Sequence, residues 1–149
     1  SKNKITAFQK LNKYILQFPK DFIGRYNFAY MAQELGFLEK AIENYKIVIK
    51  NNSNHWQSKN NLYLIYFSQK KYSESLVLVD EVLSLRPQSQ PVLRDKAHIL
   101  FYKNKLSEAL KLIQTSIKLN CWLTFIFTFY PKMVFYSSKV FRILIFIFL

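Results

Sequence analysis

The chain has 149 residues, half of them hydrophobic, and a formal net charge of +13. Only two glycines, four prolines and one cysteine occur, which disfavours a turn-rich β fold and excludes a disulfide framework or a multi-cysteine metal site within the chain. The charge favours acidic partners, although an AT-rich coding sequence, which inflates lysine, is the simpler explanation.

Helical patterns separated by short breaks run from residue 1 to about residue 121. Residues 1–21 predict one helix. Three pairs of helices follow it, and the first helix of each pair is predicted at about 22–35, 56–69 and 90–103. In the second helix that follows the first of these, apolar residues fall on one stripe, at Ala41, Ile42, Tyr45, Val48 and Ile49. Gly36 and Asn104 suit the left-handed conformation that ends a helix, whereas Lys70 suits it less well.

A repeat with a spacing of 34 residues organises these helices. Small residues recur in the second helices, at Ala7, Ala41, Ser75 and Ala109. A large aliphatic residue follows eight positions later in each case, at Ile15, Ile49, Leu83 and Ile117. Repeats of this length indicate a stacked helical array.

The small residues let two helices of a hairpin approach closely. Ala29 and Ala97 are the matching small residues of the first helices, but Tyr63 replaces them in the middle pair. We therefore expect Tyr63 to wedge the middle helices apart locally or to shift their packing.

These columns resemble the tetratricopeptide repeat (TPR) family, whose motif expects a small eighth residue, an alanine at the twentieth position and a proline near the end. The resemblance covers residues 1 to about 121: a second helix at 1–21 and units at 22–55, 56–89 and 90–121. It implies an all-α fold, a right-handed superhelical stack of antiparallel helical hairpins (a TPR-like α-solenoid). The related pentatricopeptide repeats, which bind RNA, use 35 residues, so a nucleic-acid partner is not expected.

By this resemblance, the first helices line a concave groove that binds a protein or peptide partner. The candidate partner-binding residues are Tyr26, Tyr30, Gln33, Asn60, Asn61, Leu64, Phe67, Arg94, His98 and Phe101. The structural alternative for each aromatic is packing against a neighbouring unit. Pro91 and Asp95 stand where one subfamily clamps the carboxylate of chaperone tails, so that clamp is not expected.

The sequence predicts no catalytic residue, no cofactor and no metal site. Two isolated glycines cannot form a phosphate-binding loop. His55 is expected to be a solvated loop residue, and His98 a groove residue that contacts a partner or titrates near neutral pH. Cys121 is expected to be a turn residue. The alternative to a binding module is a non-catalytic TPR arm of a larger enzyme, such as a glycosyltransferase.

Residues 122–149 depart from the repeat and are rich in aromatic and aliphatic residues. Three interpretations remain open: an aberrant or truncated C-terminus, a helical cap or self-association contact, and a membrane contact. Lys132, Lys139 and Arg142 interrupt the apolar run, which is otherwise near the length that a spanning helix needs. A cytoplasmic location is expected, with a membrane-associated adaptor held by this tail as the alternative.

Overall fold

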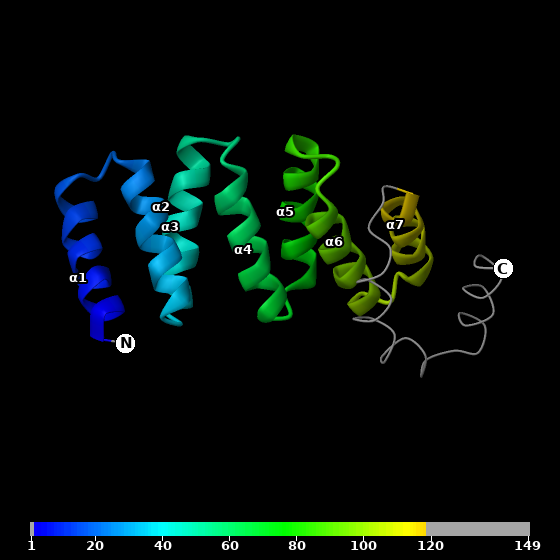
Figure 1. Ribbon diagram of the computed structural model, residues 1–149, viewed down its shortest axis with the longest axis horizontal. Coiled ribbons are helices and arrows are strands. Elements are labelled where there is room, and N and C mark those ends of the chain that lie inside the picture. Colours follow the sequence, from blue (N-terminus) through cyan, green and yellow to red (C-terminus); the bar gives the residue numbers. More distant parts are fainter. Residues whose placement is uncertain (1, 119–149) are drawn as a thin grey trace.

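The computed structural model describes residues 2–118, which form an all-α stack of antiparallel helices (Figure 1). The helices in chain order are α1 (Lys2–Gln17), α2 (Phe22–Glu34), α3 (Leu38–Asn51), α4 (Trp56–Ser68), α5 (Tyr72–Leu85), α6 (Gln90–Tyr102) and α7 (Leu106–Lys118). Each helix packs against the next one in the chain. The predicted fold class is therefore confirmed. The predictions for Cys121 and for residues 122–149 lie outside the described residues.

The three hairpin turns share one backbone geometry. Two residues after each first helix ends, the chain has a residue with positive φ: Gly36 (81°), Lys70 (60°) and Asn104 (60°). The next N–H then donates to the carbonyl five residues earlier, as from Phe37 to Ala32 at 2.8 Å. The Gly36 N–H also donates to the Gln33 carbonyl at 3.0 Å, and both capping bonds recur 34 and 68 residues later. Lys70 thus adopts the left-handed conformation although it lacks the freedom of glycine.

Replacing Lys70 with glycine is expected to raise the free energy of unfolding by about 1 kcal/mol, because glycine removes the Cβ clash of the left-handed region. Urea unfolding followed by circular dichroism measures the change. Gly36→Ala is the matched opposite change and should lower stability by about 1 kcal/mol. A Cβ at Gly36 meets nothing within 4 Å, so that loss reports backbone conformation alone. Equal stability of Lys70→Gly and the parent chain would contradict the prediction.

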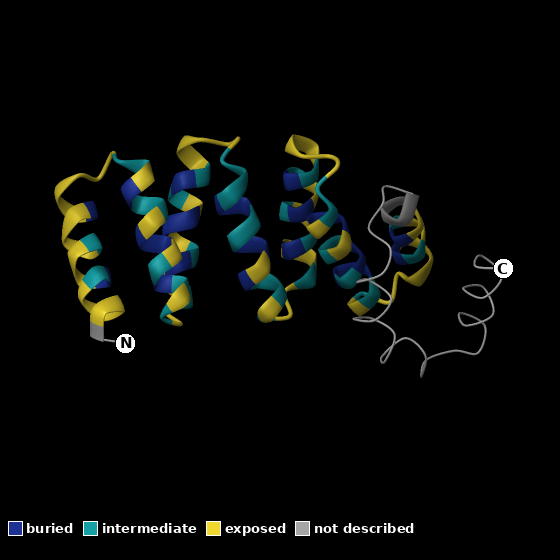
Figure 2. Cartoon of the chain, in the orientation of Figure 1, coloured by how far each residue is buried: buried dark blue, intermediate teal, exposed yellow. Residues whose placement is uncertain are grey.

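The core runs along the crossings of the three hairpins, where the small residues of α2 to α7 are buried (Figure 2). Ala29 and Ala41 are completely buried between α2 and α3, and Ala97 and Ala109 are buried between α6 and α7. Large side chains fill the space around them, and Phe28 of α2 stacks on Phe8 of α1 with ring centroids 4.9 Å apart. The repeat columns therefore specify where the helices touch.

The middle hairpin keeps a close crossing despite Tyr63. The Ser75 hydroxyl of α5 donates a 2.9 Å hydrogen bond to the backbone carbonyl of Tyr63 in α4, and both residues are buried. The Tyr63 hydroxyl donates instead to Asp95 of α6 at 2.9 Å. Tyr63 therefore does not wedge α4 and α5 apart, because its ring extends toward the next hairpin. The other expected effect, a shift in the packing of these helices, stays a prediction.

A helix that spans a bilayer needs about 20 predominantly apolar residues. None of α1 to α7 is long and apolar enough to cross a membrane.

Candidate protein-binding surface

The predicted groove residues lie on α2, α4 and α6, and none of them is fully buried. Tyr30 and Leu64 occupy equivalent positions of α2 and α4, and 46% and 37% of their surfaces are exposed. Arg94 of α6 is also exposed. The other candidates are partly buried: Tyr26, Gln33, Asn60, Asn61, Phe67, His98 and Phe101. The first helices thus present an exposed apolar pair and a set of partly buried polar and aromatic groups.

A hydrogen-bond network fixes the polar groups at the α2–α4 end of this face. The Tyr45 hydroxyl of α3 donates to Gln33 Oε1 at 3.0 Å, and Asn61 Nδ2 of α4 donates to the Tyr45 hydroxyl at 3.0 Å. Asn61 Nδ2 also lies 3.4 Å from the Tyr26 hydroxyl. Burial raises the pKa of Tyr45 well above its usual range, so its hydroxyl stays protonated. The side-chain amides of Gln33 and Asn61 are therefore held in one orientation.

An aromatic cluster occupies the α4–α6 end of the face. The Phe67 ring lies parallel to the His98 ring, with centroids 6.5 Å apart, and tilts against Tyr72 of α5 at 5.8 Å. Tyr72 stacks on Tyr102 of α6 at 5.4 Å, and Phe101 lies edge-on to Tyr102. Phe67 therefore packs neighbouring hairpins together, as the structural alternative for the groove aromatics foresaw.

The fixed cation of the face, Arg94, stands beside a half-buried carboxylate. Arg94 Nε lies 3.9 Å from Asp95 Oδ1, and Asp95 Oδ2 accepts the hydrogen bond from Tyr63. Burial raises the pKa of Asp95 above its usual value, and the Tyr63 hydrogen bond and Arg94 oppose the rise. Arg94 remains half exposed, so it can meet an acidic group of a partner.

Both histidines differ from the sequence prediction. Burial and, secondarily, the charge of Arg94 lower the pKa of His98 to about 4, so the expectation that it titrates near neutral pH is wrong. His55 is not a solvated loop residue: its Nδ1 accepts the Ser58 N–H at 3.2 Å and caps α4, and its ring lies 5.0 Å from that of Tyr26. Burial lowers its pKa as well.

Sequence reasoning missed Tyr45, Tyr72 and Tyr102, which lie outside the groove columns. Tyr45 was assigned only to the apolar stripe of its helix, yet its hydroxyl joins Gln33 to Asn61. The equivalent residues of the other second helices are Leu11, Val79 and Ile113. A hydroxyl in an otherwise aliphatic column was the signal that could have found it. Within residues 2–118, no three His, Cys, Asp or Glu side chains gather in a way that could hold a metal ion.

Comparison with known structures supports the fold. A solved structure of MamA superposes on the chain with a TM-score of 0.73 at 16% sequence identity, covering 77% of this chain and 63% of MamA. MamA from Desulfovibrio magneticus RS-1 gives a TM-score of 0.72 at 16% identity, covering 78% of this chain and 66% of that one. The chain thus spans 62% to 68% of the length of the MamA structures that it resembles, and the likeness is one of a TPR-type helical repeat fold. No protein-family model matches the sequence, and no curated protein matches it.

Proposed function

We propose that the face of α2, α4 and α6 binds a peptide or protein partner, so that the chain acts as an interaction scaffold. The observation that carries the proposal is the exposed apolar pair, Tyr30 and Leu64, on neighbouring first helices. Exposed aromatic and aliphatic side chains at matched positions give a partner contact area at little cost in side-chain ordering.

Polar groups of the same face would orient a bound partner. Gln33 and Asn61 are pinned by Tyr45, and amides held in one orientation bind a partner's backbone or side-chain groups with less loss of entropy. Arg94 adds one half-exposed cation at the other end of the face. The TPR-type fold supports this reading because stacked hairpins commonly serve as extended binding surfaces.

The double substitution Tyr30→Ala with Leu64→Ala is expected to weaken partner binding at least about tenfold, since central aromatic and aliphatic anchors carry most of the binding energy. A peptide selected from a displayed random library against the parent chain serves as the ligand, and its dissociation constant is measured by fluorescence anisotropy.

Val77→Ala is the matched control, because Val77 is an exposed aliphatic residue of α5, a second helix. Both proteins should keep the helix content of the parent, since every substituted side chain is exposed. Phe67 and Phe101 make poorer test positions because they belong to the packed aromatic cluster. If library peptides bind the double variant as tightly as the parent, the binding face lies elsewhere.

A further inference from the structure

The loops that join one hairpin to the next all lie at one edge of the stack, opposite the hairpin turns (Figure 1). We call this the loop edge, and the repeat places three equivalent corners in it: residues 16–23, 50–57 and 84–91. Its exposed cations are Lys20, Lys50 and Arg86, and its one carboxylate belongs to Asp21. The stretches of equal length at the hairpin turns mix lysines with four exposed glutamates: Glu34, Glu39, Glu74 and Glu108. The loop edge is therefore the more uniformly positive of the two.

No neighbouring carboxylate neutralises the cations of the loop edge. Within residues 2–118, Lys20 and Lys50 form no ion pair and no side-chain hydrogen bond. The Arg86 guanidinium lies over the Trp56 ring, 4.2 Å from its centroid, and it pairs with no carboxylate of the described helices and loops. The three charges are therefore available to an external anion.

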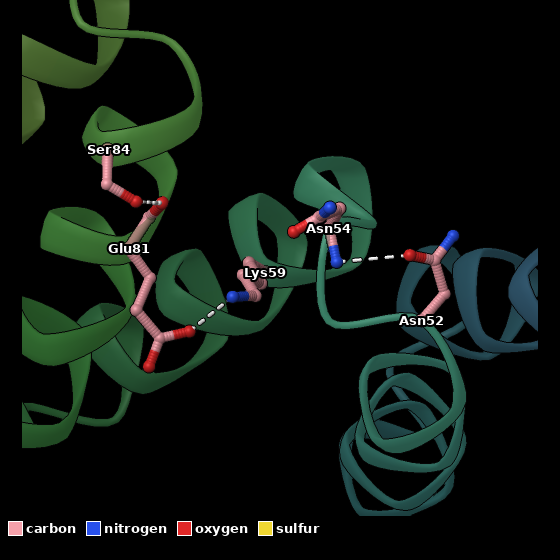
Figure 3. A network of polar contacts seen from close by, with 5 residues as sticks. All are labelled: Asn52, Asn54, Lys59, Glu81 and Ser84. Atoms are coloured by element: carbon pink, nitrogen blue, oxygen red, sulfur yellow. Dashed lines mark hydrogen bonds and ion pairs between the residues drawn. The ribbon is translucent and has the colours of Figure 1, made fainter.

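The corner between α3 and α4 shows which cation is used inside the stack (Figure 3). Lys59, in the first turn of α4, pairs with Glu81 of α5. The Asn54 N–H donates to Asn52 Oδ1 at 3.0 Å and fixes the loop before α4. Lys50 takes part in neither contact and stays exposed in the last turn of α3.

The corner between α1 and α2 adds protruding apolar side chains. Leu16 and Ile23 are each 74% exposed, the largest fraction for any large hydrophobic residue that the structure describes. Phe18 is 46% exposed, although its ring lies against Tyr14 with centroids 4.9 Å apart. Lys20 lies between these residues in the sequence. This corner thus combines apolar and cationic groups.

The exposure of these positions is a property of the corner and not of its place along the stack. The residues equivalent to Leu16 and Phe18 in the other two corners are exposed as well: Lys50, Asn52, Ser84 and Arg86. Complete hairpins lie on both sides of those corners. Pro91, the equivalent of Ile23 in α6, is also exposed. A further helix packed beside α1 would therefore leave this corner at the surface.

Hydrogen bonds fix the backbone of the corner between α1 and α2. The Phe18 N–H donates to the Tyr14 carbonyl at 2.8 Å, and the Asp21 N–H donates to the Phe18 carbonyl at 3.1 Å. Arg25 Nη2 donates to the Pro19 carbonyl at 3.2 Å. The Asp21 carboxylate caps α2 and accepts the Tyr14 hydroxyl at 2.8 Å. The apolar side chains of this corner therefore project from a loop whose shape is already set, which lowers the entropy lost on binding.

A fluid anionic lipid surface fits this combination of groups. Projecting apolar side chains enter the boundary between headgroups and acyl chains, while Lys and Arg side chains meet anionic headgroups. Nucleic acid offers phosphates to the lysines but no apolar surface for an aliphatic side chain such as Leu16. A folded protein would need a pocket matched to each projecting side chain.

We propose that the loop edge binds the surface of an anionic lipid bilayer. The proposed contact residues are Leu16, Phe18, Lys20, Ile23, Lys50 and Arg86. Contact of this kind needs no membrane-spanning helix, and none of α1 to α7 is one. The loop edge lies at the ends of the helices, whereas Tyr30 and Leu64 lie in the middle of α2 and α4, so lipid binding leaves the proposed protein-binding face free.

Acetylation of the full chain by N-hydroxysuccinimidyl acetate identifies the lysines that touch lipid. Vesicles of phosphatidylcholine with about 30% phosphatidylserine should protect Lys20 and Lys50 at least about threefold, as measured by mass spectrometry of the digested chain. Lys71 and Lys105, which are exposed at the hairpin turns, should react as they do without vesicles. Because each lysine is measured separately, contact by another part of the chain does not hide the result. Equal protection of the four lysines, or protection of none, would overturn the proposal.

Replacing the most exposed apolar side chains tests their insertion. Leu16→Gln with Ile23→Gln should weaken co-sedimentation of the full chain with the same vesicles about tenfold. The matched control, Ile5→Gln with Val77→Gln, removes two apolar side chains that are 53% and 59% exposed on α1 and α5 and should bind within about twofold of the parent. Circular dichroism should show equal helix content in the parent and in both variants.

Charge removal tests the second part of the contact. Lys20→Gln with Lys50→Gln should also weaken binding to these vesicles about tenfold, whereas Lys71→Gln with Lys105→Gln, the same change of charge at the opposite edge, should lose less than about threefold. Vesicles of phosphatidylcholine alone should bind the parent more weakly.

Three results of the co-sedimentation would contradict lipid binding by the loop edge. Unchanged binding of both loop-edge variants would mean that this edge contributes no affinity. Equal losses in the two lysine variants would indicate general attraction to a basic chain. A loss in Lys20→Gln with Lys50→Gln, while Leu16→Gln with Ile23→Gln binds like the parent, would indicate a site for a soluble polyanion.

Discussion

Replacing Tyr63 with alanine is expected to lower the free energy of unfolding by about 4 kcal/mol, the cost of deleting a large buried aromatic side chain. Tyr63 is 1% exposed and packs in one cluster with Val79 and Val82 of α5 and with Val92 and Ile99 of α6. Its loss opens a cavity where two hairpins meet. Urea unfolding of the parent chain and the variant, followed by circular dichroism, measures the difference in the free energy of unfolding.

Tyr63→Phe separates ring packing from the hydroxyl. Phenylalanine keeps the ring but removes the donor to Asp95, and the expected loss is about 1–2 kcal/mol because the half-buried carboxylate then lacks that hydrogen bond. A loss as large as that of Tyr63→Ala would mean that the Asp95 contact, and not packing, joins the two hairpins. Losses below about 1 kcal/mol in both variants would contradict the burial of this side chain.

The helical array could be predicted from the sequence because residues at equivalent positions of a repeat make equivalent contacts. Ala29 and Ala41 are small for the reason that the repeat suggests, since the two helices touch at these residues. The turn at Gly36 was similarly readable from residue type. Lys70 was not, because there the hydrogen bonds of the helix end impose a positive φ that the side chain alone disfavours.

The direction of a side chain was the information that the sequence lacked. Tyr63 was recognised as too large for its column, but the pattern of residues could not show that its ring extends to Asp95, 32 positions later. The state of His98 depended on the same kind of information. Its low pKa follows from burial beside the Phe67 ring and from the charge of Arg94, and neither follows from the spacing of residues along a helix.

The proposed binding face contains exposed side chains and side chains that pack against neighbouring helices. Tyr30 and Leu64 are exposed and free to meet a partner, whereas Phe67 is tied to Tyr72 and Tyr102. Position within the repeat could not distinguish these two classes, because Leu64 and Phe67 both belong to groove columns. Packing decides the difference, and under the proposed function it leaves Tyr30 of α2 and Leu64 of α4 as the main contacts for a partner.

The second large effect is expected at the small residues of the second helices. Ala41 is completely buried, whereas Ala7 at the equivalent position of α1 is only partly buried. Ala41→Leu is expected to lower the free energy of unfolding by about 3 kcal/mol, since Ala29 and Ala41 are completely buried and leave no room for three further carbons. Ala7→Leu makes the same change in α1, where no first helix crosses among the described residues, and should cost less than about 1 kcal/mol. Urea unfolding of both variants measures the difference. Equal losses would show that Ala7 is packed as tightly as Ala41, and would contradict the difference in their burial.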